Sequence, residues 1–340
     1  MSKTYNVAVV GATGLVGEAM IQILEERDFP VNNFYPLASQ RSAGRSLKFR
    51  DELHEVEVLD DFDFAKVQLA FFSAGGSVSA EHAPRAASAG AVVIDNTSHF
   101  RYDDDIPLVV PECNPARIAE YTNRGIIANP NCSTIQMLVA LQPIHTAVGI
   151  ERINVATYQA MSGAGRSAME ALTEQSRAQL AGAPAAANGG EKSVAFNAVP
   201  KISELMDTGY TMEEMKMVWE TRKIFEDPDI MVNPTCVRIP VYFGHSEAVH
   251  IETRTKITVP EVQTLLNSSP GVVLLDGHEP GAYPTALTDA AHRDEVYVGR
   301  IREDLSHPRG LDLWVVADNV RKGAALNSVQ IAEILVNQVM

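Results

Sequence analysis

The N-terminal 27 residues limit the fold of this chain more than any other segment. Residues 5–10, YNVAVV, are typical of a buried strand, residues 11–17 form a glycine-rich turn, and a helical pattern then runs to about Arg27. A strand that leads through glycines directly into a helix is the opening of a βαβ unit. We therefore expect a parallel sheet that starts near the N-terminus.

The same alternation continues along the first part of the chain. Strand-like runs at 33–38, 69–72 and 91–95 are joined by helix-like segments such as 78–89, and the pattern persists to about Ile127. Such alternation predicts a parallel sheet with helices on both faces.

The second part of the chain has a different pattern, in which strands dominate. Strand-like runs occupy 152–158, 235–241, 248–257, 297–302 and 311–317, with helix-like runs at 168–180 and 212–225. We expect an α+β domain with a mixed sheet, and a connecting loop of small residues at 181–190. A last stretch, 324–339, has apolar residues at helical spacing and predicts an amphipathic helix that packs on the first domain. The expected domains are 1–127 with 324–340, and 128–323.

Composition excludes several classes of function. The net charge of −15 disfavours a nucleic-acid partner, and no apolar run reaches the roughly 18 residues that span a bilayer. The three cysteines, Cys113, Cys132 and Cys236, form no CxxC pair, so we expect neither a disulfide framework nor a metal site. Without a recognisable signal peptide, the cytoplasm is the expected location.

The glycine-rich turn predicts a dinucleotide site and hence a Rossmann-type first domain. Its residues are Gly11, Ala12, Thr13, Gly14, Leu15, Val16 and Gly17. Glycines in this position let a pyrophosphate approach the backbone at a helix N-terminus. The alternative is a glycine-rich turn without a ligand.

The end of the second expected strand favours NADP over NAD. NAD enzymes tend to carry an acidic residue there for the ribose 2′-hydroxyl. This chain has instead Ser39, Arg41, Ser42 and Arg45, which offer hydroxyl donors and positive charge to a 2′-phosphate. The alternative is that these arginines are solvated loop residues.

One cysteine stands where a helix begins. Cys132 follows Asn131 and precedes the apolar helical run 135–148. The unpaired N–H groups and partial positive charge of a helix N-terminus favour thiolate over thiol. We therefore expect Cys132 to be a nucleophile that forms a thioester during oxidation or reduction of a carbonyl, rather than a buried small residue.

A nucleophilic thiol needs a group that manages protons, and His245 is the best placed histidine. Gly244 precedes it at the end of an apolar strand-like run that also carries Arg238. Residues seven apart on a regular strand point in opposite directions. Both side chains would line one site only if Pro240 or Gly244 breaks the pleat, for example by a bulge.

Five segments, in order along essentially the whole chain, carry a resemblance to a known family. They are residues 11–17, 129–134, 159–165, 213–216 and 238–245. Together they closely resemble aspartate-β-semialdehyde dehydrogenase of the bacterial type. The resemblance implies interconversion of L-aspartate 4-semialdehyde, phosphate and NADP⁺ with 4-phospho-L-aspartate and NADPH. It also implies a homodimer and a place in lysine, diaminopimelate, threonine, methionine and isoleucine biosynthesis.

The resemblance further implies a role for each site residue. Cys132 is the expected nucleophile and His245 the acid/base. Gln159 would orient the acyl intermediate, Arg238 would hold the substrate carboxylate, and Glu213 would pair with its ammonium group. Arg101 and Lys216 would bind the phosphate, and Ser162, Gly163 and Asn319 would touch the nicotinamide end of the cofactor.

Some alternatives stay open at this point. The sequence does not distinguish Glu213 from Glu214, and a Glu213–Lys216 pair is also typical of a solvated helix face. A related reductase of N-acetyl-γ-glutamyl phosphate has the same chemistry, although its substrate has no ammonium group for Glu213. A non-catalytic relative is disfavoured because Cys132, Gln159, Arg238 and His245 are all present.

Overall fold

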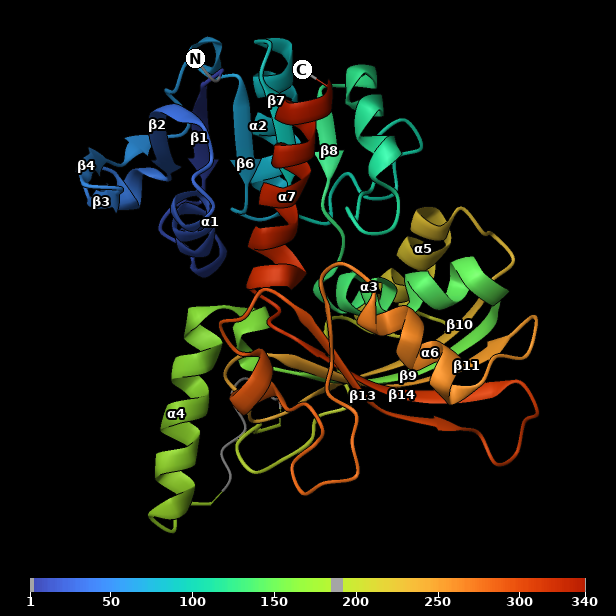
Figure 1. The fold of residues 1–340 in the computed structure, drawn as a ribbon. Helices are drawn as coiled ribbons and strands as arrows, with labels where there is room; N and C mark the ends of the chain where they lie inside the picture. The colour runs from blue at the N-terminus through green and yellow to red at the C-terminus, as the bar shows by residue number, and fades with distance from the viewer. Residues whose placement is uncertain (1–2, 185–191, 340) are drawn as a thin grey trace. The chain divides into compact units, whose positions relative to one another are not determined.

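The computed structural model describes residues 3–184 and 192–339 (Figure 1). The chain divides into two compact units, one of residues 1–130 with 324–340 and one of residues 131–323. The sequence analysis placed the first boundary at 127/128. Each unit contains its own six-stranded sheet.

The first unit has a parallel sheet with the strand order β5-β2-β1-β6-β7-β8. Its strands are β1 (Tyr5–Val10), β2 (Val31–Ala38), β5 (Glu57–Val58), β6 (Leu69–Phe72), β7 (Val92–Asp95) and β8 (Ile126–Ala128). From β1 the chain continues outward to β2 and β5, and from β6 it continues in the opposite direction to β7 and β8. The strand order therefore reverses between them, which is where open α/β sheets bind ligands.

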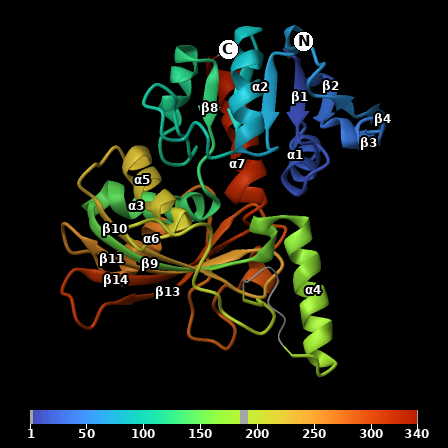
Figure 2. The same ribbon diagram turned by 180° about the vertical axis from the view of Figure 1, so that it is seen from behind.

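Helices cover both faces of this sheet, as expected. The opposite views place α1 (Leu15–Glu26) and α7 (Leu326–Ile334) on one face and α2 (Gly76–Ser88) on the other (Figure 1, Figure 2). The sequence analysis did not predict the hairpin of β3 (Ser46–Phe49) and β4 (Glu52–Glu55).

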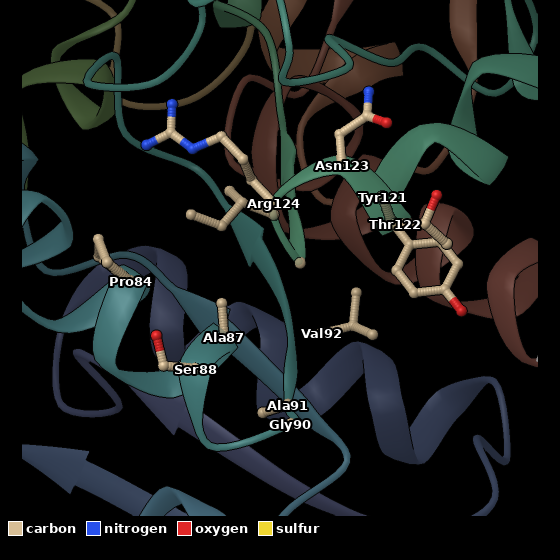
Figure 3. A pocket seen from close by; sticks show the side chains of 12 residues that line it. Pro84, Ala87, Ser88, Gly90, Ala91, Val92, Tyr121, Thr122, Asn123 and Arg124 are labelled. Atoms are coloured by element: carbon tan, nitrogen blue, oxygen red, sulfur yellow. The ribbon is translucent and has the colours of Figure 1, made fainter.

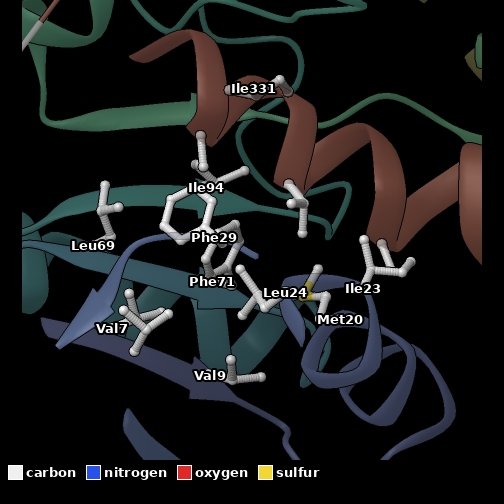
Figure 4. Close-up of a cluster of buried hydrophobic side chains, with 14 of the residues drawn as sticks. Val7, Val9, Met20, Ile23, Leu24, Phe29, Leu69, Phe71, Ile94 and Ile331 are labelled. Carbon is white, nitrogen blue, oxygen red and sulfur yellow. The ribbon is translucent and has the colours of Figure 1, made fainter. Parts of the chain in front are cut away.

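The core of the first unit lies between the sheet, α1 and α7 (Figure 4). Nearly every residue of β1 is buried, and Val7 and Val9 both face this core because alternate strand residues point to the same side. The core side chains labelled in the figure are Val7, Val9, Met20, Ile23, Leu24, Phe29, Leu69, Phe71, Ile94 and Ile331.

The C-terminal helix differs from the amphipathic helix that we expected. It packs within the first unit, but polar residues on it are buried together with the apolar ones. Fully buried Asn327 donates through Nδ2 to the Val109 carbonyl at 3.0 Å and to Asn129 Oδ1 at 2.7 Å. This polar side chain therefore binds neighbouring segments instead of facing solvent.

The second unit has a mixed sheet with the order β10-β9-β11-β14-β13-β12, which confirms the predicted α+β architecture. Its strands are β9 (Ile150–Gln159), β10 (Met231–Arg238), β11 (His245–Thr253), β12 (Val272–Leu274), β13 (Val296–Glu303) and β14 (Gly310–Ala317). Two pairs, β9 with β10 and β12 with β13, are parallel, and the other neighbours are antiparallel.

Three helices cover one face of the mixed sheet: α3 (Cys132–Val148), α5 (Met212–Phe225) and α6 (Val259–Asn267) (Figure 1). The helix α6 was not predicted from the sequence. The predicted strand 248–257 is also too long, because β11 ends at Thr253. The missed signal is a capping box, in which Glu261 binds the Thr258 backbone at the start of the helix. The helix α4 (Arg166–Leu180) follows β9, and most of the predicted 181–190 loop lies outside the described residues.

Candidate active site

Three strand ends meet at one edge of the mixed sheet. The strands β9 and β10 are parallel and in register, so Gln159 and Arg238 lie side by side where both strands end. The neighbouring strand β11 is antiparallel to β9, and it therefore begins at that same edge with His245. Their side chains belong to different strands, yet the topology gathers them in one place.

The sequence predicts that Arg238 and His245 line one site only if Pro240 or Gly244 interrupts the strand, and the strand is interrupted between them. The strand-like run 235–241 is not continuous, because β10 ends at Arg238 and a non-regular connection leads to β11. Gly244, with φ +87°, makes the final turn. No bulge is needed, since the two residues lie on strands that flank β9 on opposite sides.

Cys132 is the first residue of α3, and its side chain is partly exposed. Asn131 caps this helix, because its Oδ1 accepts hydrogen bonds from the backbone N–H groups of Ser133 at 3.0 Å and Thr134 at 3.3 Å. The predicted position of Cys132 in the first turn is confirmed. Its sulfur therefore stands at the positive end of the helix.

Two carboxylates from α5 hold the cap residue in place. Glu220 accepts a hydrogen bond from the Asn131 backbone N–H at 2.6 Å, and Glu213 accepts one from Asn131 Nδ2 at 2.9 Å. Sequence reasoning missed Glu220, because its partner is 89 residues away in the chain.

The structure distinguishes Glu213 from Glu214. Glu214 completes the capping box of α5 with Thr211 and accepts a hydrogen bond from the Cys236 backbone N–H at 3.0 Å. Glu213 instead contacts Asn131 and accepts a hydrogen bond from Gln159 Nε2 at 3.1 Å. Of the two, Glu213 is therefore the carboxylate beside the cysteine helix.

Glu213 is also paired with a cation. Lys216 Nζ lies 2.8 Å from Glu213 Oε2, and both side chains are largely buried, unlike a solvated helix pair. Burial would raise the pKa of Glu213, but Lys216 and the hydrogen bonds from Lys216, Gln159 and Asn131 lower it to about 2. Glu213 is therefore ionised at neutral pH and can bind an ammonium group.

Arg238 brings positive charge to the same region. Its Nη1 donates to the Ala160 carbonyl at 2.6 Å. Burial lowers the pKa of Arg238, whereas the negative charges of Cys132 and Glu213 raise it. This mutual influence means that the guanidinium favours a thiolate at Cys132.

His245 is completely buried, with the two ring nitrogens in different environments. Nδ1 accepts a hydrogen bond from the Ala160 backbone N–H at 3.0 Å, and Nε2 has no hydrogen-bond partner among the described residues. A Cβ atom placed on Gly163 would lie 3.3 Å from His245 Nε2 and 3.2 Å from Arg238 Nη1. Glycine at 163 therefore keeps space open beside both groups.

The residues expected at the nicotinamide end form a second small cluster in this unit. Ser162 Oγ donates to Asn319 Oδ1 at 3.0 Å, and the Gly244 N–H donates to that same oxygen at 3.1 Å. The side chains of Ser162 and Asn319 are buried. The cluster ties the turn before His245 to the segment that follows β14.

Gly323 lies directly against the cysteine, which sequence reasoning did not predict. A Cβ atom at this position would be 2.7 Å from Cys132 Cβ and 3.2 Å from its Cα. Only glycine leaves room for the cysteine in its present position.

Glu247 is a buried acid that the sequence did not single out. It lies on β11 two residues after His245 and is completely buried. Burial raises the pKa of Glu247 well above its usual value, although the nearby Gln136 and Ser133 side chains lower it. We infer that Glu247 is protonated beneath the first turns of α3.

The glycine turn of the first unit fits a pyrophosphate. Gly11 adopts φ +83°, and a Cβ atom on Gly17 would lie 2.2 Å from the Gly11 oxygen, so α1 packs on the turn only with glycine there. Gly14 caps α1 without a side-chain hydrogen bond, which leaves the N-terminal N–H groups accessible to an anion.

The segment after β2 lies beside this turn. The Gly11 and Ala12 N–H groups donate to the Leu37 carbonyl, and Thr13 Oγ1 lies 3.5 Å from Ser42 Oγ. Ser39, Arg41 and Arg45 are exposed, and in the described chain neither arginine forms an ion pair. These groups suit a phosphate on the adenosine ribose.

Arg101 belongs to the first unit, whereas Lys216 belongs to the second. The Arg101 side chain is buried, and its Nη2 donates to the Asn96 carbonyl at 3.0 Å. The positive charge of Arg101 also lowers the pKa of Asp95, which burial raises overall.

A surface pocket of about 570 Å³ in the first unit is separate from these residues (Figure 3). It lies between the end of α2 and residues 121–126, and no predicted site residue lines it. Among the described residues there is no cluster of His, Cys, Asp and Glu suited to a metal, and no helix is long and apolar enough to span a membrane.

Comparisons with known proteins show the family to which the chain belongs. The family descriptions "semialdehyde dehydrogenase, NAD binding domain" and "semialdehyde dehydrogenase, dimerisation domain" match residues 6–121 and 141–322. Aspartate-semialdehyde dehydrogenase 2 of Vibrio cholerae is 59% identical over 336 residues, 99% of each chain. This chain belongs to the aspartate-semialdehyde dehydrogenase family. The enzyme of Legionella pneumophila is also 59% identical, over 98% of this chain and 96% of that one.

Solved structures of aspartate-semialdehyde dehydrogenases agree closely with this one. Enzyme II of Vibrio cholerae, in complex with ASA, has a TM-score of 0.97 at 57% identity and covers 100% of both chains. The Candida albicans enzyme with NADP has a TM-score of 0.76 at 25% identity over 98% of each chain. This chain is therefore an aspartate-semialdehyde dehydrogenase, an oxidoreductase of aspartate-family amino-acid biosynthesis.

Glu247→Gln should stabilise the protein increasingly as the pH rises. In the wild type, the folded state keeps a proton on Glu247 that the unfolded state releases above about pH 4.3. Wild-type stability therefore falls by roughly 1 kcal/mol per pH unit until the folded pKa is passed. Glutamine avoids this loss. Between pH 5 and 8, the melting temperature of E247Q should rise increasingly above that of the wild type. The melting temperature of Glu174→Gln, an exposed control on α4, should differ from that of the wild type by the same amount at every pH. Parallel curves for E247Q would contradict a buried protonated acid.

Gly323→Ala should impair the enzyme by displacing Cys132. The added methyl group would lie 2.7 Å from Cys132 Cβ, and misplacing a reacting group by about 1 Å costs up to about 100-fold in rate. We expect kcat to fall about 10- to 100-fold and iodoacetamide to alkylate Cys132 at a changed rate. Gly76→Ala is the control, because its Cβ would meet only ordinary contact at 4.0 Å. Wild-type values for both measurements in G323A would refute the tight contact.

Proposed function

We propose that this chain interconverts L-aspartate 4-semialdehyde, phosphate and NADP⁺ with 4-phospho-L-aspartate and NADPH through a thioester on Cys132. The observation that carries this proposal is the position of Cys132 at the start of α3, near the charge of Arg238 and the Asn131–Glu213–Gln159 cluster. The ASA named in the complex of the Vibrio cholerae enzyme supports the substrate.

The charges of the second unit match those of the substrate. In this proposal Cys132 attacks the carbonyl carbon, and Arg238 holds the α-carboxylate by a planar two-point contact. Glu213 pairs with the ammonium group, and Gln159 orients the acyl intermediate. His245 acts as the general acid/base, and backbone N–H groups near Cys132 stabilise the oxyanion.

Phosphate would be bound by two cations. We assign Lys216 and Arg101 to this role, because each is a largely buried cation in a protein of net charge −15. Lys216 would then turn from Glu213 toward the phosphate when the substrate ammonium neutralises Glu213.

We assign the cofactor NADP to this chain, with hydride transfer as the chemistry that it supplies. The glycine turn 11–17 would hold its pyrophosphate, and Ser39, Arg41 and Ser42 its 2′-phosphate. Ser162, Gly163 and Asn319 would contact its nicotinamide end. The fit of the glycine turn, the cations after β2 and the NADP of the Candida albicans relative support this assignment.

We also propose a homodimer in the cytoplasm. The match to a dimerisation domain supports self-association, and one face of the mixed sheet is only partly covered, with half-exposed side chains such as Tyr158, Ala248 and Trp314. The three cysteines form no disulfide in the described chain, which fits a reducing compartment.

Cys132→Ser should abolish turnover, because the alkoxide needed for the same attack is not available at neutral pH. The measurement is NADP⁺ reduction that requires both aspartate semialdehyde and phosphate. Cys113→Ser, at a partly exposed cysteine of the other unit, should keep wild-type activity. Unchanged turnover of C132S would end the proposal, and wild-type preference for N-acetyl-glutamate semialdehyde would overturn the substrate.

Arg41→Ala should weaken NADP binding selectively. A charge-assisted hydrogen bond to phosphate is worth about 1.5–3 kcal/mol, so KM for NADP⁺ should rise roughly 10- to 100-fold. KM for NAD⁺, which lacks the 2′-phosphate, should stay the same. Lys48→Ala, which removes another exposed cation of the first unit, is the control. An equal rise for both cofactors would reject the proposed 2′-phosphate contact.

A further inference from the structure

We propose that Asn327 on α7 is a positioning residue for phosphate binding, because through Asn129 and Asn96 it holds the loop that carries Arg101. The inference deepens the function proposed above and rests on its assignment of Arg101 to phosphate. It follows from hydrogen bonds that link the side-chain amides of Asn327, Asn129 and Asn96, called here the amide chain, all within the first unit.

The side-chain amide of Asn327 can have only one orientation. Its Nδ2 donates to the Val109 carbonyl at 3.0 Å, and since a carbonyl oxygen only accepts, the NH2 end must face that group. The same NH2 group donates its second hydrogen to Asn129 Oδ1 at 2.7 Å. Asn327 is completely buried, so bulk water does not compete for either contact.

This orientation determines that of the other two amides. Since Asn129 accepts through Oδ1, its NH2 group faces away from Asn327 and donates to Asn96 Oδ1 at 2.6 Å. Asn129 Nδ2 also lies 3.3 Å from the Pro130 carbonyl, which independently requires an NH2 group there. Asn96 Nδ2 has no hydrogen-bond partner in the described part of the chain, so the bond from Asn129 is what holds the Asn96 side chain.

Asn129 supports the end of β7 through two hydrogen bonds. Besides the bond to the Asn96 side chain, its backbone N–H donates to the Asp95 carbonyl at 2.8 Å. Asn129 is completely buried, as is Asn327. The last residue of β7 and the first residue of the loop that follows are therefore both bound to Asn129, which is in turn bound to α7.

The loop that begins at Asn96 carries Arg101. Arg101 Nη2 donates to the Asn96 backbone carbonyl at 3.0 Å, so the guanidinium is anchored on the residue that the amide chain holds. The same peptide unit is fixed at its other end, because the Thr97 N–H donates to Asp95 Oδ1 at 3.0 Å. A long arginine side chain has many rotamers. Its anchor therefore decides where the charge lies, which a two-point contact to phosphate requires.

Loss of the Asn327 amide should affect phosphate and not the other ligands. Without its donor, the Asn129 amide can rotate, Asn96 loses its defined partner, and the anchor of Arg101 shifts. The residues assigned to the semialdehyde are held by other contacts in the second unit, such as Arg238 by the Ala160 carbonyl. The glycine turn assigned to the cofactor is held by the Leu37 carbonyl.

The first test compares Asn327→Ala with Ser328→Ala. Ser328 is the next residue of α7, and its buried hydroxyl has no hydrogen-bond partner among the described residues, so S328A breaks no hydrogen bond. We expect N327A to raise KM for phosphate about 2- to 30-fold, the range for residues that act through a network. KM for aspartate semialdehyde and for NADP⁺ should stay the same, and S328A should keep all three values. Equal rises of all three in N327A, or the same phosphate effect in S328A, would overturn the inference.

The second test changes the other end of the amide chain and serves also if N327A does not fold. Asn96 is only partly buried, so Asn96→Ala removes less packing. We expect N96A to raise KM for phosphate in the same range as N327A. The double variant should be no worse than the worse single variant, because both substitutions break the same connection. An unchanged KM for phosphate in N96A, or effects that multiply in the double variant, would overturn the inference.

Hydrogen exchange separates this inference from the proposed function. In the full-length protein without substrate, backbone amides of residues 96–101 should exchange faster in N327A than in the wild type or S328A, as measured by mass spectrometry. If the wild type is active but N327A leaves this exchange unchanged, only the inference fails. If the exchange is faster but the wild type has no phosphate-dependent activity, the proposed function fails, and the phosphate role of the amide chain fails with it.

Discussion

The site depends on the hydrogen bonds of Asn131. This side chain caps α3 and thereby decides that the helix begins at Cys132, with the sulfur at its positive end. Glu220 binds its backbone and Glu213 its side-chain amide, so two carboxylates of α5 set the direction from which α3 starts. Because Glu213 also binds Gln159, the same carboxylate connects the helix that carries Cys132 to the sheet edge.

The directions of the strands explain why Gln159, Arg238 and His245 lie together. Parallel pairing of β9 with β10 and antiparallel pairing with β11 place two strand ends and one strand start at one edge. The cation Arg238 and the neutral His245 lie at this edge, and the anion Glu213 binds Gln159 at the same edge. In the proposed function, an acidic protein binds an anionic substrate because a few cations are buried close to Cys132, where water screens them little.

Local patterns in the sequence were sufficient for the two sheets, for the glycine turn and for the position of Cys132, since strand alternation and helix capping act over few residues. Other features depend on distant partners. Nothing near Glu247 in sequence indicates that β11 buries it under α3, and nothing near Gly323 indicates its contact with Cys132. The predicted strand-like run 235–241 was too long, because β10 ends at Arg238, and sheet pairing rather than the apolar run alone sets where a strand ends.

The most direct measurement is peptide mass spectrometry of enzyme incubated with aspartate semialdehyde and NADP⁺ but without phosphate. With no phosphate to cleave it, the acyl group should remain on sulfur, and the peptide that contains Cys132 should gain the mass of one aspartyl group. An enzyme that turns over with phosphate, yet carries that mass on another residue or on none, would contradict the account.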